Sequence, residues 1–126
     1  MTERNDGIFP IADHDWHSQT YVEEWIRRDI SRHDARRPRL QEMLSLASLD
    51  SDSDIAVLDV GGGYGVVSEE VLRAFPRAVV ALQDYSQPML GFARQRLALM
   101  RAGCDTSSPI YVIRPGSIAS EVPLIS

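Results

Sequence analysis

Residues 55–65 read Ile55-Ala56-Val57-Leu58-Asp59-Val60-Gly61-Gly62-Gly63-Tyr64-Gly65, an apolar run followed by glycine at alternate positions. The apolar run predicts a buried β-strand, and residues 66–75 have the apolar spacing of a helix. Glycine adopts positive φ easily and lets a ligand approach the backbone. The first turn of a helix offers free N–H groups to ligand oxygens. Strand, glycine turn and helix therefore predict a parallel α/β sheet with a nucleotide-type site.

A second strand and a second acid follow this unit. Residues 78–82 are apolar and predict another buried parallel strand, which ends just before Asp84. Asp84 lies 19 residues after Gly65, near the offset of about 20 at which such units place a ribose-binding acid. Ser86 is expected to cap a helix running to about Arg101, with Gly103 ending it. Residues 110–113 predict a third strand.

Two short motifs resemble those of the Rossmann-like (class I) S-adenosylmethionine-dependent methyltransferases. The first is D-x-G-x-G-x-G from Asp59 to Gly65, and the second is D-x-S-x-x-M-L over residues 84–90. The resemblance covers residues 16–113 and implies S-adenosyl-L-methionine as cofactor. The cofactor-binding residues that it implies are Asp59, Gly61, Gly62, Gly63, Tyr64, Gly65, Asp84, Tyr85 and Met89.

The resemblance also implies individual roles. In that family the glycine loop passes the methionine part of the cofactor, and the acid after the second strand holds the ribose, which is the role implied for Asp84. Tyr85 and Met89 would lie near the adenine. Each has a plainer interpretation, because Asp84 also suits a strand-end turn and Met89 a core position. The glycine string by itself also fits a tight turn that binds no ligand.

Composition restricts the class of protein. The chain has 126 residues, which is one domain by length, with 44% hydrophobic and 25% charged residues. No apolar run approaches the ~20 residues that span a membrane, and the N-terminus lacks a signal-peptide core. Cys104 is the only cysteine, so no internal disulfide forms. These features and the net charge of −5 predict a cytoplasmic protein that binds neither membranes nor nucleic acid.

The N-terminal part, residues 1–50, is expected to hold a leader and two helices, ahead of an α/β part at residues 51–126. The helices are expected from Ser18 to about Arg32 and after Pro38. Interleaved acids favour a salt-bridged surface over an RNA-binding face for the arginine cluster at residues 27–39. Histidines and aspartates at residues 13–17 suggest a metal site only weakly, and we predict none. The nearby aromatics, Trp16, Tyr21 and Trp25, suit a core contact better than a lid over the cofactor.

The sequence matches only part of the family's seven-strand fold. It predicts a partial Rossmann-like parallel sheet of about three strands, with helices on both faces, and a chain truncated relative to the family. The acid that touches adenine in the family is replaced by glycine and serine at residues 116–117. The family's central strand would become an edge at Ile55–Val60, so a homodimer or a partner chain is expected to cover it.

The leading hypothesis is thus an S-adenosylmethionine-binding domain of methyltransferase type that acts on an unidentified small-molecule acceptor. Whether the 126-residue chain is itself an active enzyme stays open, and no residue is assigned as catalytic. One alternative is a non-catalytic remnant that acts by association through its open strand. A nicotinamide-dependent oxidoreductase fragment is less favoured, because G-x-G-x-x-G would require glycine or alanine at Val66 or Ser68.

Overall fold

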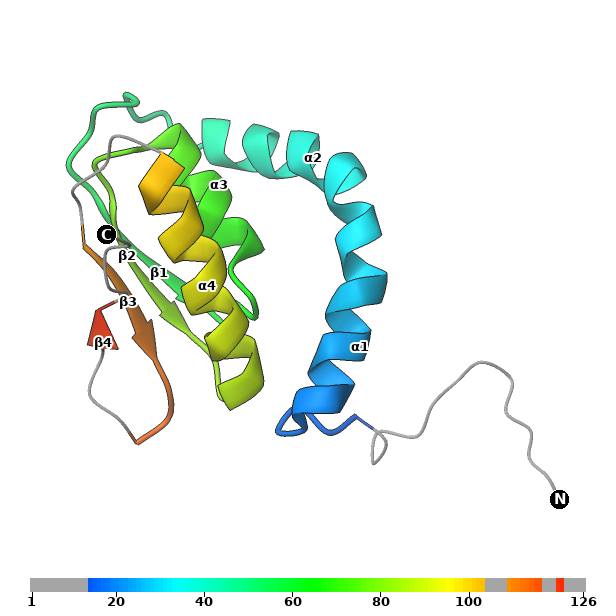
Figure 1. The fold of residues 1–126 in the computed structure, drawn as a ribbon. Helices are drawn as coiled ribbons and strands as arrows, with labels where there is room; N and C mark the ends of the chain where they lie inside the picture. The colour runs from blue at the N-terminus through cyan, green and yellow to red at the C-terminus, as the bar shows by residue number, and fades with distance from the viewer. Residues whose placement is uncertain (1–13, 104–108, 117–119, 122–126) are drawn as a thin grey trace, which may run out of the picture.

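The computed structural model describes residues 14–103, 109–116 and 120–121. Its helices and strands follow the predicted order and confirm the α/β class (Figure 1). They are α1 (Gln19–Asp29), the 3₁₀ helix η2 (Ile30–Arg32), α2 (His33–Ser45), β1 (Ala56–Val60), α3 (Val66–Ala74), β2 (Val79–Gln83), α4 (Gln87–Gly103), β3 (Ile110–Ile113) and β4 (Ser120–Glu121).

The sheet has the order β1-β2-β3-β4, with the first three strands parallel. Ala56 lies opposite Val79, and Val80 lies opposite Ile110. The short β4, which the sequence did not predict, runs antiparallel to β3. Within the described residues β1 has one neighbour, so it forms an edge of the sheet as expected.

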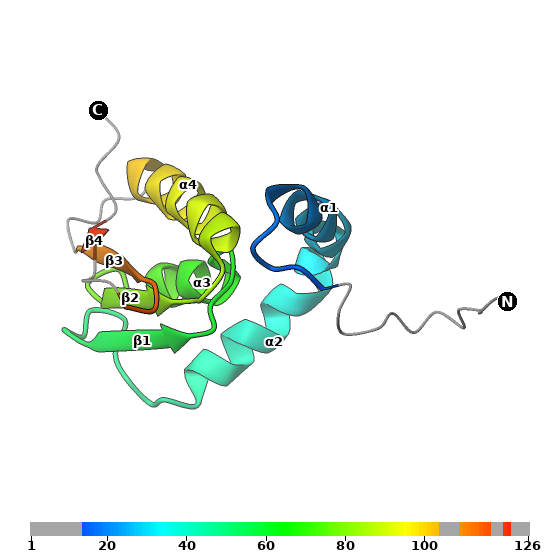
Figure 2. The same ribbon diagram turned by 90° about the horizontal axis from the view of Figure 1, so that it is seen from below.

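Both crossover helices, α3 and α4, lie on the same face of the sheet (Figure 2). This differs from the expected cover on both faces. The reason is the strand order, because two successive crossovers of the same hand that step in one direction place their helices on one side. On the opposite face Leu58 and Val60 are 62% and 71% exposed.

The main core fills the space between the sheet and these two helices. Leu82 of β2 and Val112 of β3 meet Leu72 of α3 and Leu97 of α4 there, and all four are almost fully buried. A second apolar cluster lies where α1 and α2 approach the glycine loop and α4. The cavity described below adjoins this second cluster.

Local signals located the starts of α1 and α4 but not the start of α2. Ser18 and Ser86 cap α1 and α4 as expected, accepting hydrogen bonds from the backbone N–H groups of Tyr21 and Met89 at 3.2 Å each. Pro38, however, lies inside α2 rather than before it. Gly103 is the last residue of α4 rather than a left-handed residue beyond it.

Candidate functional site

The loop between β1 and α3 depends on glycine for two reasons. Gly61, Gly63 and Gly65 have φ of 66°, 60° and 93°, in the left-handed region that other residues rarely adopt. Gly62 is required by packing, because a Cβ there would lie 2.7 Å from Cγ of Leu82 and 2.8 Å from Oδ2 of Asp59. The loop can thus lie closely against both strands only with glycine at these positions.

Asp84 fixes this loop to the end of β2. Its Oδ2 accepts a hydrogen bond from the backbone N–H of Gly63 at 2.9 Å, and its Oδ1 accepts one from Ser86 at 2.9 Å. Gln83, which sequence reasoning missed, adds two more contacts. Its side-chain oxygen accepts from the N–H of Gly61 at 3.1 Å, and its carbonyl accepts from the N–H of Gly62 at 2.9 Å. The glycine loop is therefore preorganised by the neighbouring strand.

A cavity of about 320 Å³ opens beside the loop, at the lower end of the ~300–1,000 Å³ range of small-molecule sites. Its walls are Trp16, Trp25, Asp29, Arg36, Gly61, Gly62, Gly63, Tyr64, Val66, Val67, Asp84, Tyr85, Ser86 and Met89. The predicted site residues are thus gathered here, except Asp59 and Gly65. Asp59 lies beneath the loop instead, where its Oδ2 accepts a hydrogen bond from Ser68 Oγ at 2.7 Å.

Aromatic rings form the wall opposite the sheet. Trp16 and Trp25 meet edge to face with centroids 5.5 Å apart, and Trp25 meets the Tyr64 ring at 6.1 Å. Both tryptophans are partly buried against the second apolar cluster while they also line the cavity. They therefore combine the core role favoured from the sequence with a place in the cavity wall.

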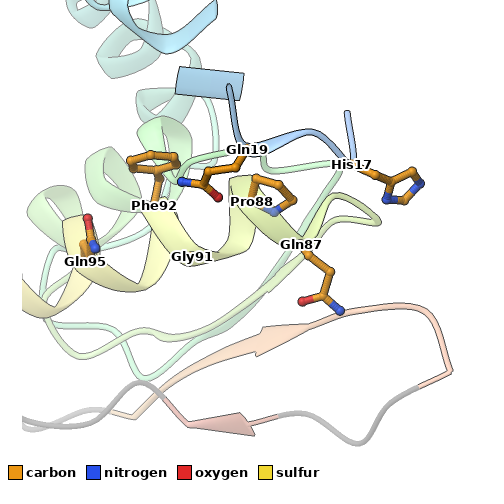
Figure 3. Close-up of a pocket in the computed structure, with 7 residues that line it drawn as sticks. All are labelled: His17, Gln19, Gln87, Pro88, Gly91, Phe92 and Gln95. Atoms are coloured by element: carbon orange, nitrogen blue, oxygen red, sulfur yellow. The ribbon is translucent and has the colours of Figure 1, made fainter. Parts of the chain in front are cut away.

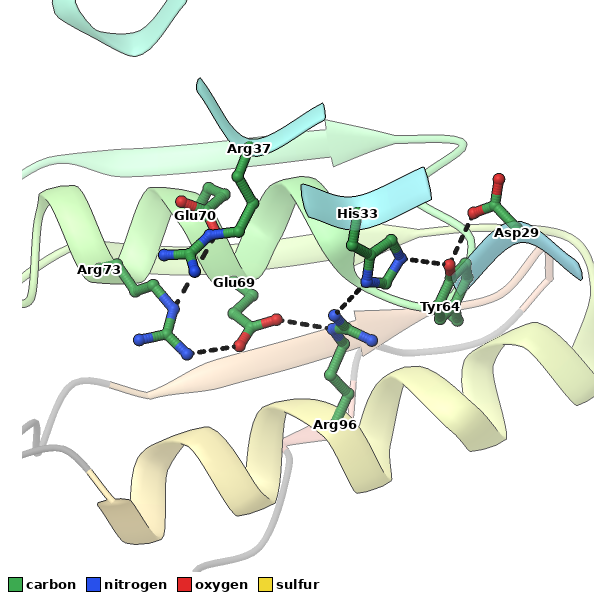
Figure 4. Close-up of polar contacts among 8 residues, drawn as sticks. All are labelled: Asp29, His33, Arg37, Tyr64, Glu69, Glu70, Arg73 and Arg96. Carbon is green, nitrogen blue, oxygen red and sulfur yellow. Dashed lines mark hydrogen bonds and ion pairs between the residues drawn. The ribbon is translucent and has the colours of Figure 1, made fainter. Parts of the chain in front are cut away.

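A polar cluster joins the glycine loop to the N-terminal helices (Figure 4). Tyr64 is 5% exposed, and its hydroxyl donates to Asp29 Oδ2 at 2.6 Å and lies 2.5 Å from His33 Nε2. Arg36 binds both carboxylate oxygens of Asp29, at 2.7 and 3.1 Å. The hydrogen bonds from Arg36 hold the pKa of Asp29 below its ordinary value, although burial opposes this. Burial, and then the bond to Asp29, raises the pKa of Tyr64.

The hydrogen-bond partners indicate a neutral His33. The single hydroxyl proton of Tyr64 is donated to Asp29, so the nearby Nε2 of His33 must carry a hydrogen and donate to the tyrosine oxygen. Its Nδ1 then accepts from Arg96, whose Nη2 is 3.2 Å away. Burial and the charge of Arg96 lower the pKa of His33, in agreement with this assignment.

The cluster continues into ion pairs between the helices. Arg96 of α4 binds Glu69 of α3 at 2.7 Å, and Arg37 of α2 binds Glu70 of α3 at 3.0 Å (Figure 4). Burial works to raise the pKa of Glu69, but hydrogen bonds from Arg73 and Arg96 outweigh it and lower that pKa. α3 follows the glycine loop and α4 follows Asp84 in the chain. Because both helices take part in the cluster, it holds the cavity walls together.

Comparisons with known proteins leave the family open. A scan against protein-family models finds no match, and neither does a search of the curated proteins. The likeness to methyltransferases therefore rests on the two sequence motifs alone.

In the described ranges, no helix combines the length and the hydropathy that a membrane span requires. The same ranges show no group of three or more acid, histidine or cysteine side chains suited to a metal ion. The family places an acid at the adenine in the segment after the third strand. In this chain Ser117 of that segment lies outside the described residues, and none of residues 114–116 lines the cavity.

Proposed function

We propose that the cavity binds S-adenosyl-L-methionine, and that the chain supplies the cofactor half of a site that passes a methyl group to an unidentified small molecule. One observation carries this proposal. The glycine loop after β1 and Asp84 after β2 are joined by the Gly63–Asp84 hydrogen bond and face the same cavity. In parallel α/β sheets, ligands bind at the carboxyl ends of the strands.

The charges around the cavity suit this cofactor. Each oxygen of Asp84 accepts one backbone N–H and keeps a lone pair for a ribose hydroxyl. Arg36 lines the cavity, and the guanidinium N–H groups that it does not donate to Asp29 are suited to the carboxylate of a methionine moiety. The rings of Trp16 and Trp25 are suited to a sulfonium, since aromatic faces attract cations. Arg36, Trp16 and Trp25 are not part of the two sequence motifs.

The residues around the cavity favour positioning over acid–base chemistry. Methyl transfer from a sulfonium depends mainly on in-line alignment and exclusion of water, which aromatic walls and a preorganised loop supply. Tyr64 is unsuited to act as a base, because its proton is held by Asp29 and its pKa is raised by burial. We therefore assign no catalytic residue.

Calorimetric titration with S-adenosylmethionine and S-adenosylhomocysteine tests the proposal. Both should bind, and Asp84→Asn should weaken binding at least about tenfold, because a charged acceptor of two hydroxyls is lost. Asp54→Asn is the matched control, since Asp54 is an exposed acid whose partner, Arg77, lies outside the cavity. Circular dichroism checks that both variants are folded. Unchanged affinity in folded Asp84→Asn would refute the proposal.

The exposed strand β1 favours a second candidate, a non-catalytic remnant that acts only by association. The same titration separates the candidates, because a folded chain that binds neither nucleoside supports the remnant. Including NAD tests the oxidoreductase alternative, for which NAD should bind in preference to S-adenosylhomocysteine.

A further inference from the structure

A second cavity of about 300 Å³ lies on the outer side of α4, where the segment before α1 crosses it (Figure 3). It is lined by His17, Gln19, Gln87, Pro88, Gly91, Phe92 and Gln95. None of these residues lines the glycine-loop cavity. Its floor is the stripe Gln87, Gly91 and Gln95, which share one face of α4 because they are four residues apart.

Gly91 is the unusual feature of this stripe. Gly91 is not one of the described glycines that have a positive φ. Its backbone conformation would therefore accept residues other than glycine. Apart from its chain neighbours and the backbone of its own helix, no heavy atom lies within 4 Å of the position that a Cβ would take, so packing does not demand glycine either. Glycine is nevertheless the poorest helix former after proline. What it provides here is bare backbone at the floor of a cavity, where a flat group can approach closely.

The polar groups around the floor are neutral amides. Within the residues that the structure describes, the side-chain amides of Gln87 and Gln95 have no hydrogen-bond partner, and they are exposed to solvent. Each carries both donors and an acceptor. The lining also includes the imidazole of His17, but no Asp, Glu, Lys or Arg. The ring of Phe92, half-buried, and the buried ring of Pro88 supply flat apolar surface.

We propose that this cavity binds an uncharged planar ligand, an aromatic ring that carries a carboxamide-like edge. Its ring would lie over the backbone at Gly91, against Phe92. Its amide edge would pair with the amide of Gln87 or Gln95, since two amides satisfy each other's donor and acceptor. The site is independent of S-adenosylmethionine.

Benzamide is the simplest probe, and benzoate is its charged counterpart of equal size. In NMR titrations of ¹⁵N-labelled protein, millimolar benzamide should shift the side-chain amide signals of Gln87 and Gln95. Benzoate should bind at least several-fold more weakly, since neither lysine nor arginine lines the cavity and the chain carries a net charge of −5. Absence of shifts with benzamide, or equal binding of benzoate, would overturn the proposal.

Gly91→Leu tests the site itself, because leucine would fill its floor. Benzamide affinity should fall at least about tenfold, while the melting temperature should not fall, because leucine is the better helix former. Loss of binding therefore cannot be ascribed to unfolding. Gly103→Leu is the matched control, as Gly103 ends the same helix with open space around it and lies outside the cavity. Full affinity in Gly91→Leu would contradict the assignment.

Discussion

Tyr64 shows how much of this site depends on one side chain. It stands among the loop glycines, yet its hydroxyl reaches Asp29 at the end of α1 and His33 at the start of α2. Its ring lies under the guanidinium of Arg96, 5.3 Å from ring centroid to Cζ. The position and direction of the N-terminal helices relative to the glycine loop therefore rest largely on this contact.

Tyr64→Phe should destabilise the folded state by about 1–3 kcal/mol, the usual cost of leaving buried polar groups without a partner. The ring would still pack, but the Nε2–H of His33 would lose its acceptor. Urea unfolding monitored by tryptophan fluorescence measures the change, and both tryptophans lie near this residue. A change within error of zero would show that water replaces the hydroxyl.

The neutral state of His33 predicts a pH dependence. Because its pKa in the folded state is below the ordinary 6.5, the unfolded chain binds more protons between these two values. The stabilisation is therefore present above about pH 6.5 and is lost as the pH falls toward the folded pKa. Asp29, whose pKa is also lowered, adds loss only in a more acidic range, below its ordinary 3.8.

His33→Gln separates this effect from others. A glutamine amide can donate to Tyr64 and accept from Arg96 as the neutral imidazole does, but it does not titrate. Thermal unfolding of this variant should therefore change less between about pH 7 and pH 5 than that of the parent. An equal change in both proteins would mean that His33 does not control the acid sensitivity.

Some site residues were predictable because their constraint is local. A glycine that needs positive φ, such as Gly63, leaves its mark at its own position in the sequence. Asp84 was predicted because its offset from the loop, across one helix and one strand, is typical of nucleotide-binding α/β units. Asp29 and Arg36 left no such mark, since their place in the cavity depends on how α1 and α2 pack on Tyr64, 35 residues after Asp29. Tertiary packing of this kind has no short-range signal.

At the scale of elements, the strands and the starts of α1 and α4 were predicted well, whereas the predicted start of α2 was wrong. β3 spans the predicted residues 110–113, because a short apolar run between turn signals leaves few alternatives. Pro38 was expected to mark a helix start, yet it lies in the sixth position of α2. Contacts of α2 with α3, including the Arg37–Glu70 ion pair, outweigh the hydrogen bond that the proline removes.

The same substitution should have opposite effects at two glycines. Gly91→Ala should stabilise the chain by about 0.4–1 kcal/mol, because α4 has open space there and the unfolded chain loses freedom. Gly65→Ala should destabilise it by more than about 1 kcal/mol, because φ of 93° at the start of α3 is strained for alanine. Chemical denaturation of both variants measures the difference. Destabilisation by Gly91→Ala would contradict the open helical position in α4, and stabilisation by Gly65→Ala would contradict the left-handed turn before α3.

At the scale of the molecule, the described residues form a parallel sheet that has helices on one face and no partner strand along the outer edge of β1. Parallel sheets are almost always covered on both faces. Open edges of stable monomers usually carry lysine, proline or a bulge. The chain contains no lysine, and β1 has neither proline nor a charge on its open face, where Ala56, Leu58 and Val60 lie.

We therefore expect two copies to associate through β1. In an antiparallel pair centred on Leu58, Ala56 of one copy would face Val60 of the other, so the apolar side chains would meet on the same face. Multi-angle light scattering should show a concentration-dependent dimer of the 14.1 kDa chain.

Leu58→Lys should shift this equilibrium to the monomer, because a charge on the open edge opposes pairing. Leu58 is 62% exposed, so the fold of each copy should survive the change. Leu99→Lys is the matched control, since Leu99 is 67% exposed but lies on α4, away from β1. If the parent chain is monomeric at every concentration, or if both variants dissociate the dimer equally, β1 is not the interface. A monomeric parent that still binds S-adenosylhomocysteine would also separate association from cofactor binding, because the glycine loop is built within one chain.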